Sequence, residues 1–163
     1  MSAQPLADLI RDFYLERVRL LMRHEDVAVV VTDYDANNAY QYIVAREETH
    51  LSWLLHALLD LGSPIPAEPS RGVAPSAKGD SWKGLAGDDA RGNAQFVEKW
   101  RPLIEGVTNA RHRGMLNVIL GEMLEHKRLF DQAAEGRQDL IGKSLEINDH
   151  SGTVMPVRFV GDI

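Results

Sequence analysis

The stretch LADLIRDFYLERVRLLMRHEDVAVVVTDYDANNAYQYIVAREETHLSWLLHALLDL, residues 6–61, contains no glycine and no proline. Fifty-six residues without a helix breaker predict that helices fill this part of the chain. Apolar residues recur within it at steps of three and four, the period of one helix face. They form two stripes: Leu6, Leu9, Ile10, Phe13, Leu20 and Leu21, and then Ile43, Leu51, Leu54, Leu58 and Leu61.

Two stripes predict two helices joined by a turn. Residues 33–37 are the best candidate for this turn, with Asp35 or Asn37 as the N-cap of the second helix. A break near residues 24–26 is the alternative, and the run Val27 to Val31 would then be a strand. We favour the turn at residues 33–37.

The segment Gly62 to Gly87 has a different composition and predicts a long connection. Its 26 residues include five Gly, four Pro and four Ser, so we expect no helix in it. Fully extended it could reach roughly 85 Å, whereas a helix of about 27 residues is about 40 Å long. It can therefore span a bundle from end to end and connect two parallel helices, as in four-helix bundles with one long crossover.

Two more helices are predicted after this crossover. The third covers about residues 88–107, with Asp88 as a plausible N-cap, and the fourth covers about residues 110–134, with Gly136 as its stop. The inward residues are Phe96, Val97, Trp100, Leu103 and Ile104, and then Met115, Ile119, Leu129 and Phe130. The predicted fold is an all-α four-helix bundle over residues 1–137, with the crossover at about 62–87. Residues 138–163 form a C-terminal extension, an irregular arm or a short β-hairpin.

Composition excludes several classes of function. The 163 residues contain 18 Lys and Arg against 24 Asp and Glu, a net charge of 18 − 24 = −6, which argues against nucleic acid as the main partner. The absence of cysteine excludes disulfides, iron–sulfur clusters and thiolate zinc sites, so any metal must be held by His, Asp or Glu. We expect no signal peptide and no membrane segment, and a cytoplasmic protein.

Polar side chains interrupt the apolar stripes of three helices. Glu47 lies at the centre of the second stripe with His50 at its edge, and His126 lies at the centre of the fourth with Glu122 at its edge. Glu16 lies close to the first stripe. A solvated glutamate or a core histidine is the commoner explanation for each residue alone. Together they favour metal binding, because buried carboxylates need a partner and the inward faces offer few cations.

The remaining histidines are not expected at this site. We expect His24, His112 and His150 at the surface, and His56 lies well off the Glu47 face. No His-x-x-x-His pair occurs, which argues against a hemerythrin-like site.

The runs Arg46-Glu47-Glu48-Thr49-His50 and Gly121-Glu122-Met123-Leu124-Glu125-His126 resemble the ferritin-like superfamily, and rubrerythrin-like proteins in particular. The resemblance covers about residues 6–135 and implies a glutamate from the first helix, Glu-x-x-His from the second, acids from the third and Glu with His from the fourth. Glu16 and Glu47 are 31 residues apart, which fits the spacing of the family. The third helix departs from the pattern: its stripe extends backwards only to Asn93 and Asp89, and Asp89 could equally be an N-cap.

The ligand set that the resemblance implies is Glu16, Glu47, His50, Asp89, Glu122 and His126. Glu47 and Glu122 would bridge two iron or manganese ions, Glu16 and Asp89 would be terminal ligands, and each histidine would bind one metal. This di-iron centre implies oxidoreductase chemistry with O2 or peroxide. Since no cysteine is present for a rubredoxin-like iron centre, electrons would come from an external donor. We expect a homodimer.

Two other functions stay open from the sequence. One is a ferritin-like bundle with a degenerate site that acts as a dimeric binding or structural module. Its inward acids would then be protonated, or paired with arginines such as Arg46 or Arg113. The other is a zinc hydrolase or isomerase, which the acid-rich ligand set disfavours.

Overall fold

The computed structural model describes residues 4–142, and this part of the chain is helical without strands. It contains α1 (Leu6–Val30), α2 (Tyr34–Asp60), a short 3-10 helix η1 (Gly79–Ser81), α3 (Trp82–Glu105) and α4 (Ala110–Ala134). The all-α prediction is therefore confirmed, and the four helices are compatible with a four-helix bundle. The short hairpin expected around residues 144–160 lies outside the described residues.

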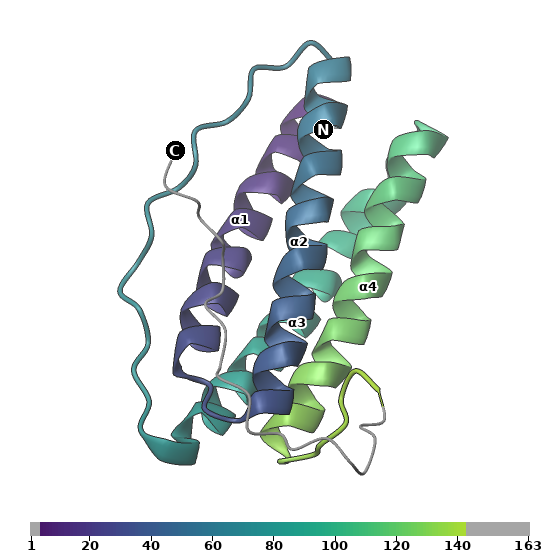
Figure 1. Cartoon of the computed structure of the whole chain (residues 1–163). Coiled ribbons are helices and arrows are strands. Elements are labelled where there is room, and N and C mark those ends of the chain that lie inside the picture. The colour runs from purple at the N-terminus through teal and green to yellow at the C-terminus, as the bar shows by residue number, and fades with distance from the viewer. Residues whose placement is uncertain (1–3, 143–163) are drawn as a thin grey trace.

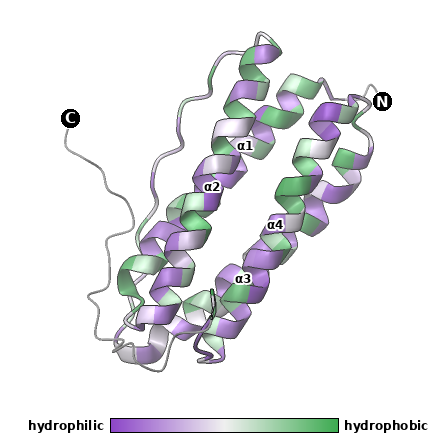
Figure 2. Cartoon of the chain, turned by 45° about the vertical axis from the view of Figure 1, so that its right-hand side comes forward, coloured by the Kyte–Doolittle hydropathy of each residue, from purple (hydrophilic) through white to green (hydrophobic). Residues whose placement is uncertain are grey.

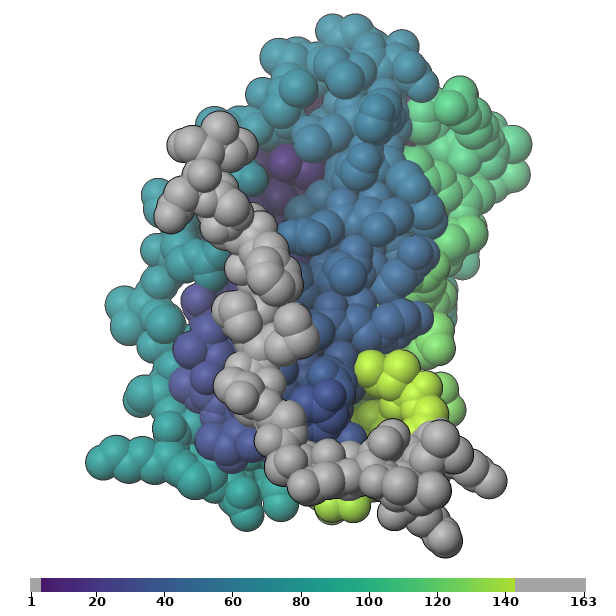
Figure 3. Space-filling model, viewed as in Figure 1, coloured from purple at the N-terminus to yellow at the C-terminus, as the bar shows by residue number. Residues whose placement is uncertain are grey.

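The helices form two antiparallel hairpins, α1 with α2 and α3 with α4 (Figure 1). The hairpins meet where α1 packs on α3 and where α2 packs on α4. Since α2 and α3 run in the same direction, the crossover between them must follow the full length of the bundle. In Figures 1 and 3 it does so along the side of α1.

One side chain attaches the crossover to α1. The guanidinium of Arg71 donates to Asp26 at 2.6 Å, to Glu25 at 2.5 Å and to the carbonyl of Met22 at 3.1 Å. These contacts join the middle of the crossover to the last third of the helix. Near the end of the crossover, Ala77 packs against the apolar cluster that contains Trp82.

The turn between α1 and α2 is tighter than expected. Asp33 is the N-cap of α2 and accepts a hydrogen bond from the backbone N–H of Ala36 at 2.9 Å, so the prediction of Asp35 or Asn37 is wrong. Asn37 instead donates its side-chain amide to the carbonyl of Ala28, which ties α2 to the end of α1. The strand alternative is also wrong, because α1 continues through Val27 to Val30.

The third helix begins six residues earlier than expected, at Trp82 rather than Asp88. Asp88 and Asp89 are therefore interior residues of α3, and neither is its N-cap. Trp82 is 1% exposed and packs in an apolar cluster with Ala86 and Ala90. Burial of this ring outweighs the cost of two helical glycines, about 1 kcal/mol each. The fourth helix and the turn at Gly136 are as predicted.

The apolar core is divided into two clusters, one at each end of the bundle. One contains Phe13, Leu58, Trp100 and Leu116, and the other contains Val27, Tyr40, Trp82 and Phe130. Figure 2 shows hydrophobic and hydrophilic residues mixed along all four helices, as amphipathic helices require. Between the clusters every helix contributes polar residues to the interior, and this polar layer contains the candidate site.

Candidate functional site

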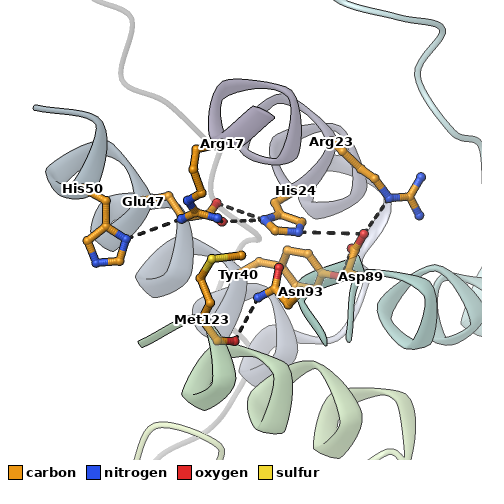
Figure 4. Close-up of polar contacts among 9 residues, drawn as sticks. All are labelled: Arg17, Arg23, His24, Tyr40, Glu47, His50, Asp89, Asn93 and Met123. Atoms are coloured by element: carbon orange, nitrogen blue, oxygen red, sulfur yellow. Dashed lines mark hydrogen bonds and ion pairs between the residues drawn. The ribbon is translucent and has the colours of Figure 1, made fainter. Parts of the chain in front are cut away.

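The polar layer is almost completely closed to solvent. Its fully buried members, each at most 1% exposed, come from all four helices: Arg17 and His24 from α1, Glu47 and His50 from α2, Asp89 and Asn93 from α3, and His126 from α4. Figure 4 shows most of these side chains converging between the helices. Buried ionisable groups are costly unless they are paired, so their partners determine what the site can do.

The centre of the layer is an ion-pair cluster around Glu47. Arg17 donates to its carboxylate at 3.2 Å, and His24 Nδ1 lies 2.9 Å from both carboxylate oxygens (Figure 4). Burial alone would raise the pKa of Glu47, but His24 and Arg17 outweigh it and hold that pKa at about 2. Burial opposes the charged form of His24, yet Glu47 and Asp89 raise its pKa. Glu47 is therefore an ionised carboxylate neutralised by two residues of α1.

A second carboxylate, Glu122, lies at the α2–α4 side of the layer and is partly exposed. Arg46 donates to both of its oxygens, at 2.7 and 3.0 Å, and His50 Nε2 lies 2.8 Å away. The hydrogen bond from Arg46 lowers the pKa of Glu122 to about 2 despite some desolvation, and His50 adds to the effect. Burial and the nearby Arg17 lower the pKa of His50 to about 4. Neutral His50 thus donates through Nε2 to Glu122, while its Nδ1 faces Arg17 at 3.4 Å.

The third carboxylate, Asp89, lies at the opposite side, between α1 and α3. It accepts from the hydroxyl of Tyr40 and from Arg23 Nε, both at 2.6 Å. Burial and the negative charge of Asp89 raise the pKa of Tyr40 well above its usual value, so this phenol stays protonated. His24 Nε2 is 4.0 Å from Asp89, too far for a hydrogen bond. Each of the three carboxylates therefore has an arginine of its own.

His126 differs from the rest of the layer because neither ring nitrogen has a hydrogen-bond partner among the described residues. Its ring is fully buried, stacked at 6.2 Å from His50 and edge-on to Tyr42 at 6.1 Å. Burial lowers the pKa of His126 to about 4 although Glu47 opposes this, so the ring is neutral near pH 7. A buried polar group without a partner costs about 1–3 kcal/mol.

The structure brings together four of the six residues that the sequence indicated. All four lie toward α2 and α4, and a fifth, Asp89, belongs to the same polar layer but lies at its α1–α3 side: the four are Glu47, His50, Glu122 and His126. Glu16 lies elsewhere, where it accepts from Lys99 at 2.6 Å and from Trp100 Nε1 at 3.1 Å. Within residues 4–142 no group of three or more His, Asp or Glu side chains is arranged to hold a metal ion. The ligand roles stay a prediction.

The sequence indicated Arg46 as a possible partner of an inward acid, which the structure confirms, but sequence reasoning missed Arg17 and Arg23 and placed two histidines wrongly. His24 and His112 were expected at the surface, but they are 0% and 7% exposed. A signal for Arg17 and His24 was present, since Ile10, Phe13, Arg17, Leu21 and His24 follow one another at steps of three and four. Arg17 and His24 thus continue the apolar stripe of α1 and point inward with it.

The charges of the layer do not fit a two-metal centre. The case for metals assumed that few cations faced the inward carboxylates, and this assumption is wrong: Arg17 pairs with Glu47, Arg23 with Asp89 and Arg46 with Glu122. Two divalent ions would add four positive charges to carboxylates that are already neutralised, one of them by a fully buried guanidinium. Repulsion between like charges at close range in the interior opposes this arrangement.

Comparisons with known proteins do not assign the chain to a family. No family model, no curated protein and no solved structure matches it. Among residues 4–142, none of the helices combines the length and the apolar character needed to cross a bilayer.

Proposed function

We propose that this protein is a ferritin-like four-helix bundle in which an arginine-centred ion-pair network replaces the two-metal centre. It acts as a binding or structural module, in the cytoplasm and as a homodimer. The observation that carries the proposal is Arg17: its guanidinium is completely buried and contacts both Glu47 and His50, two residues of the expected ligand set. The positive charge of Arg17 therefore neutralises Glu47, as a metal cation would do at this position.

The balance of charge supports this function. Three carboxylates and three arginines neutralise one another in the layer, and His24 lies within hydrogen-bond distance of Glu47. A buried ion pair whose partners are both present is tolerated, whereas removal of one partner leaves an uncompensated charge. Metal binding to Glu47 would require Arg17 to leave, and the side chain of Arg17 has no exposed area through which to do so.

Metal analysis of the purified protein tests the proposal directly. The full chain would be expressed with iron and manganese supplied and without a histidine tag, then analysed for metals and melted with and without a chelator. We expect well under one metal per chain and an unchanged Tm. Two metals per chain would overturn the proposal. Light scattering of the same sample tests the homodimer.

A charge-reversed variant sharpens the test. In Arg17→Glu a fourth carboxylate is added to the layer and faces Glu47 and His50, so we expect a less stable protein whose Tm rises when Mn²⁺ or Fe²⁺ is added. Arg101→Glu, on the exposed side of α3, is the matched control and should show no metal dependence. A metal-independent Tm in Arg17→Glu would argue that Arg17 does not stand in the place of a cation.

A metal-binding function is the second candidate, and His126 favours it. Its two nitrogens, which have no partner among the described residues, belong to a ring stacked on neutral His50, and ionised Glu122 is one turn earlier on α4. These are the protonation states that metal ligands need. A single iron or manganese ion here would carry the oxidoreductase chemistry with O2 or peroxide that the sequence suggested. About one metal per chain, lost in His126→Ala and kept in His56→Ala, would establish this candidate over the first.

A further inference from the structure

A cavity of about 250 Å³ lies between α2 and α4 at the end of the bundle farthest from the α1–α2 turn. Its lining residues are Trp53, His56, Ala57, Asp60, Arg111, His112 and Met115. Cavities for drug-sized ligands measure about 300–1,000 Å³, so this one suits a smaller molecule. It is separate from the polar layer and contains none of the residues proposed there as metal ligands.

The rim of the cavity carries two charges at the wrong ends of their helices. Asp60 is the last residue of α2, where the helix dipole favours a cation, and Arg111 is the second residue of α4, where it favours an anion. The two side chains lie 3.7 Å apart and are 57% and 82% exposed, so their own pairing contributes little. Two charges at one cavity that both oppose the helix dipole, without a compensating gain in stability, are typical of a binding site.

These charges and the two helix ends specify the same ligand. A ligand ammonium would be attracted by Asp60 and by the carboxyl end of α2. A ligand carboxylate would be attracted by Arg111 and by the amino end of α4. Because the two helix ends are neighbours, both groups must lie within one small molecule. The rim is thus complementary to a zwitterion rather than to a simple anion or cation.

The walls of the cavity are mainly apolar and aromatic. Trp53, Ala57 and Met115 provide the apolar surface. The ring of Trp53 contacts the ring of His50, with centroids 5.4 Å apart, and the guanidinium of Arg46 lies over it at 5.8 Å. His112 also lines the cavity; it is 93% buried (100 − 7), and its Nδ1 has no hydrogen-bond partner among the described residues. An aromatic body in the ligand would lie against Trp53 and Met115.

We propose that this cavity binds a free α-amino acid with an aromatic or large apolar side chain. Asp60 binds the ammonium group, Arg111 binds the carboxylate, and the side chain lies against Trp53 and Met115. The inference rests on the proposed function only in treating the bundle as a binding module, and it names the class of ligand. It does not depend on whether the polar layer holds a metal.

Titration calorimetry on the full chain tests the ligand class with three probes. L-phenylalanine has both charges, phenethylamine lacks the carboxylate, and 3-phenylpropanoate lacks the ammonium group. We expect L-phenylalanine to bind tightest, and each half-ligand to bind at least about tenfold more weakly. No heat from L-phenylalanine at roughly millimolar concentration, or equal binding of either half-ligand, would overturn the proposal.

Variants at the rim separate binding from folding. Asp60→Asn and Arg111→Gln should each weaken L-phenylalanine binding about tenfold or more, with an equal or higher Tm, since each removes an unfavourable charge from a helix end. Lys127→Gln breaks an exposed ion pair with Asp131 in the last two turns of α4 and is the matched control. Equal losses of binding in the control and the rim variants would contradict the assignment.

The fluorescence of Trp53 gives an independent readout. L-phenylalanine should change the tryptophan emission of the wild type, and Trp53→Phe should remove that change while Trp82 and Trp100 still emit. A change that persists in Trp53→Phe would place the ligand elsewhere. Two metals per chain together with L-phenylalanine binding would overturn the proposed function and leave this inference intact. A metal-free chain that does not bind L-phenylalanine would overturn this inference and leave the proposed function intact.

Discussion

Arg17 determines how the charges of the core are balanced, and its removal gives the first prediction. In Arg17→Met the buried carboxylate of Glu47 keeps only His24 as a partner. We expect the free energy of unfolding, measured with urea, to fall by about 3–5 kcal/mol. Arg101→Met, on the exposed side of α3, should change it by no more than about 0.5 kcal/mol. A loss below about 1 kcal/mol for Arg17→Met would mean that Arg17 is not essential to the ionic core.

The shifted pKa values predict how stability depends on pH. The pKa values of His50 and His126 are about 4 in the folded protein, so the unfolded chain binds protons more readily between about pH 6.5 and 4. The pKa values of Glu47 and Glu122 are about 2 in the folded protein, so the unfolded chain also binds protons more readily at these carboxylates, at lower pH. Stability should therefore fall steadily on acidification, and melting curves from pH 7.5 to 3 would show it.

One variant isolates the histidine part of this dependence. His126→Leu removes a ring that resists protonation, so the loss of Tm between pH 7 and 4 should become shallower than in the wild type. His56→Leu, at an exposed position, serves as the control. His24 acts in the opposite sense. Its pKa is raised in the folded protein, so its contribution to stability is lost as the pH rises through that pKa. Melting curves that are flat from pH 7 to 4 would contradict the buried neutral histidines.

At the scale of the helices, the turn between α1 and α2 gives a prediction about capping. Asp33→Ala removes the side chain that accepts from Ala36, and should cost about 1 kcal/mol of unfolding free energy. Asp35→Ala lies inside the first turn of α2, not at its N-cap, and should cost less. Thermal or urea unfolding of the two variants distinguishes them, and a larger loss in Asp35→Ala would show the cap to be misplaced.

The sequence predicted the positions of the helices better than it predicted the contacts between them. Apolar spacing and the positions of Gly and Pro are local properties, so the four helices, the existence of a long crossover and the bounds of α4 followed from them. The start of α3 did not, because local rules penalise Gly84 and Gly87, while burial of Trp82 depends on residues of three other helices. Likewise, Glu47 was recognised as inward, but its pairing with Arg17, 30 residues away, depends on how α1 and α2 pack.

At the scale of the whole molecule, the polar layer separates the two apolar clusters and should favour specificity over stability. A triple variant, Arg17→Met, His24→Leu and Glu47→Leu, replaces the central cluster with apolar side chains. We expect it to be as stable as the wild type or more stable, by up to about 4 kcal/mol. Its helices should align less uniquely, seen as broader NMR lines. A triple variant less stable than Arg17→Met alone would contradict this account.

The parallel arrangement of α2 and α3 has a consequence for how the chain could be divided. Each hairpin has its own short turn, and the crossover that joins the two hairpins lies outside the bundle. Asp89 and Glu122 belong to the second hairpin, and Arg23, Tyr40, Arg46 and His50, which bind them, belong to the first. The two hairpins therefore recognise each other through side-chain contacts and not through the crossover that links them covalently. Cut within the crossover, the protein becomes a pair of complementary fragments, the arrangement on which split reporters are built.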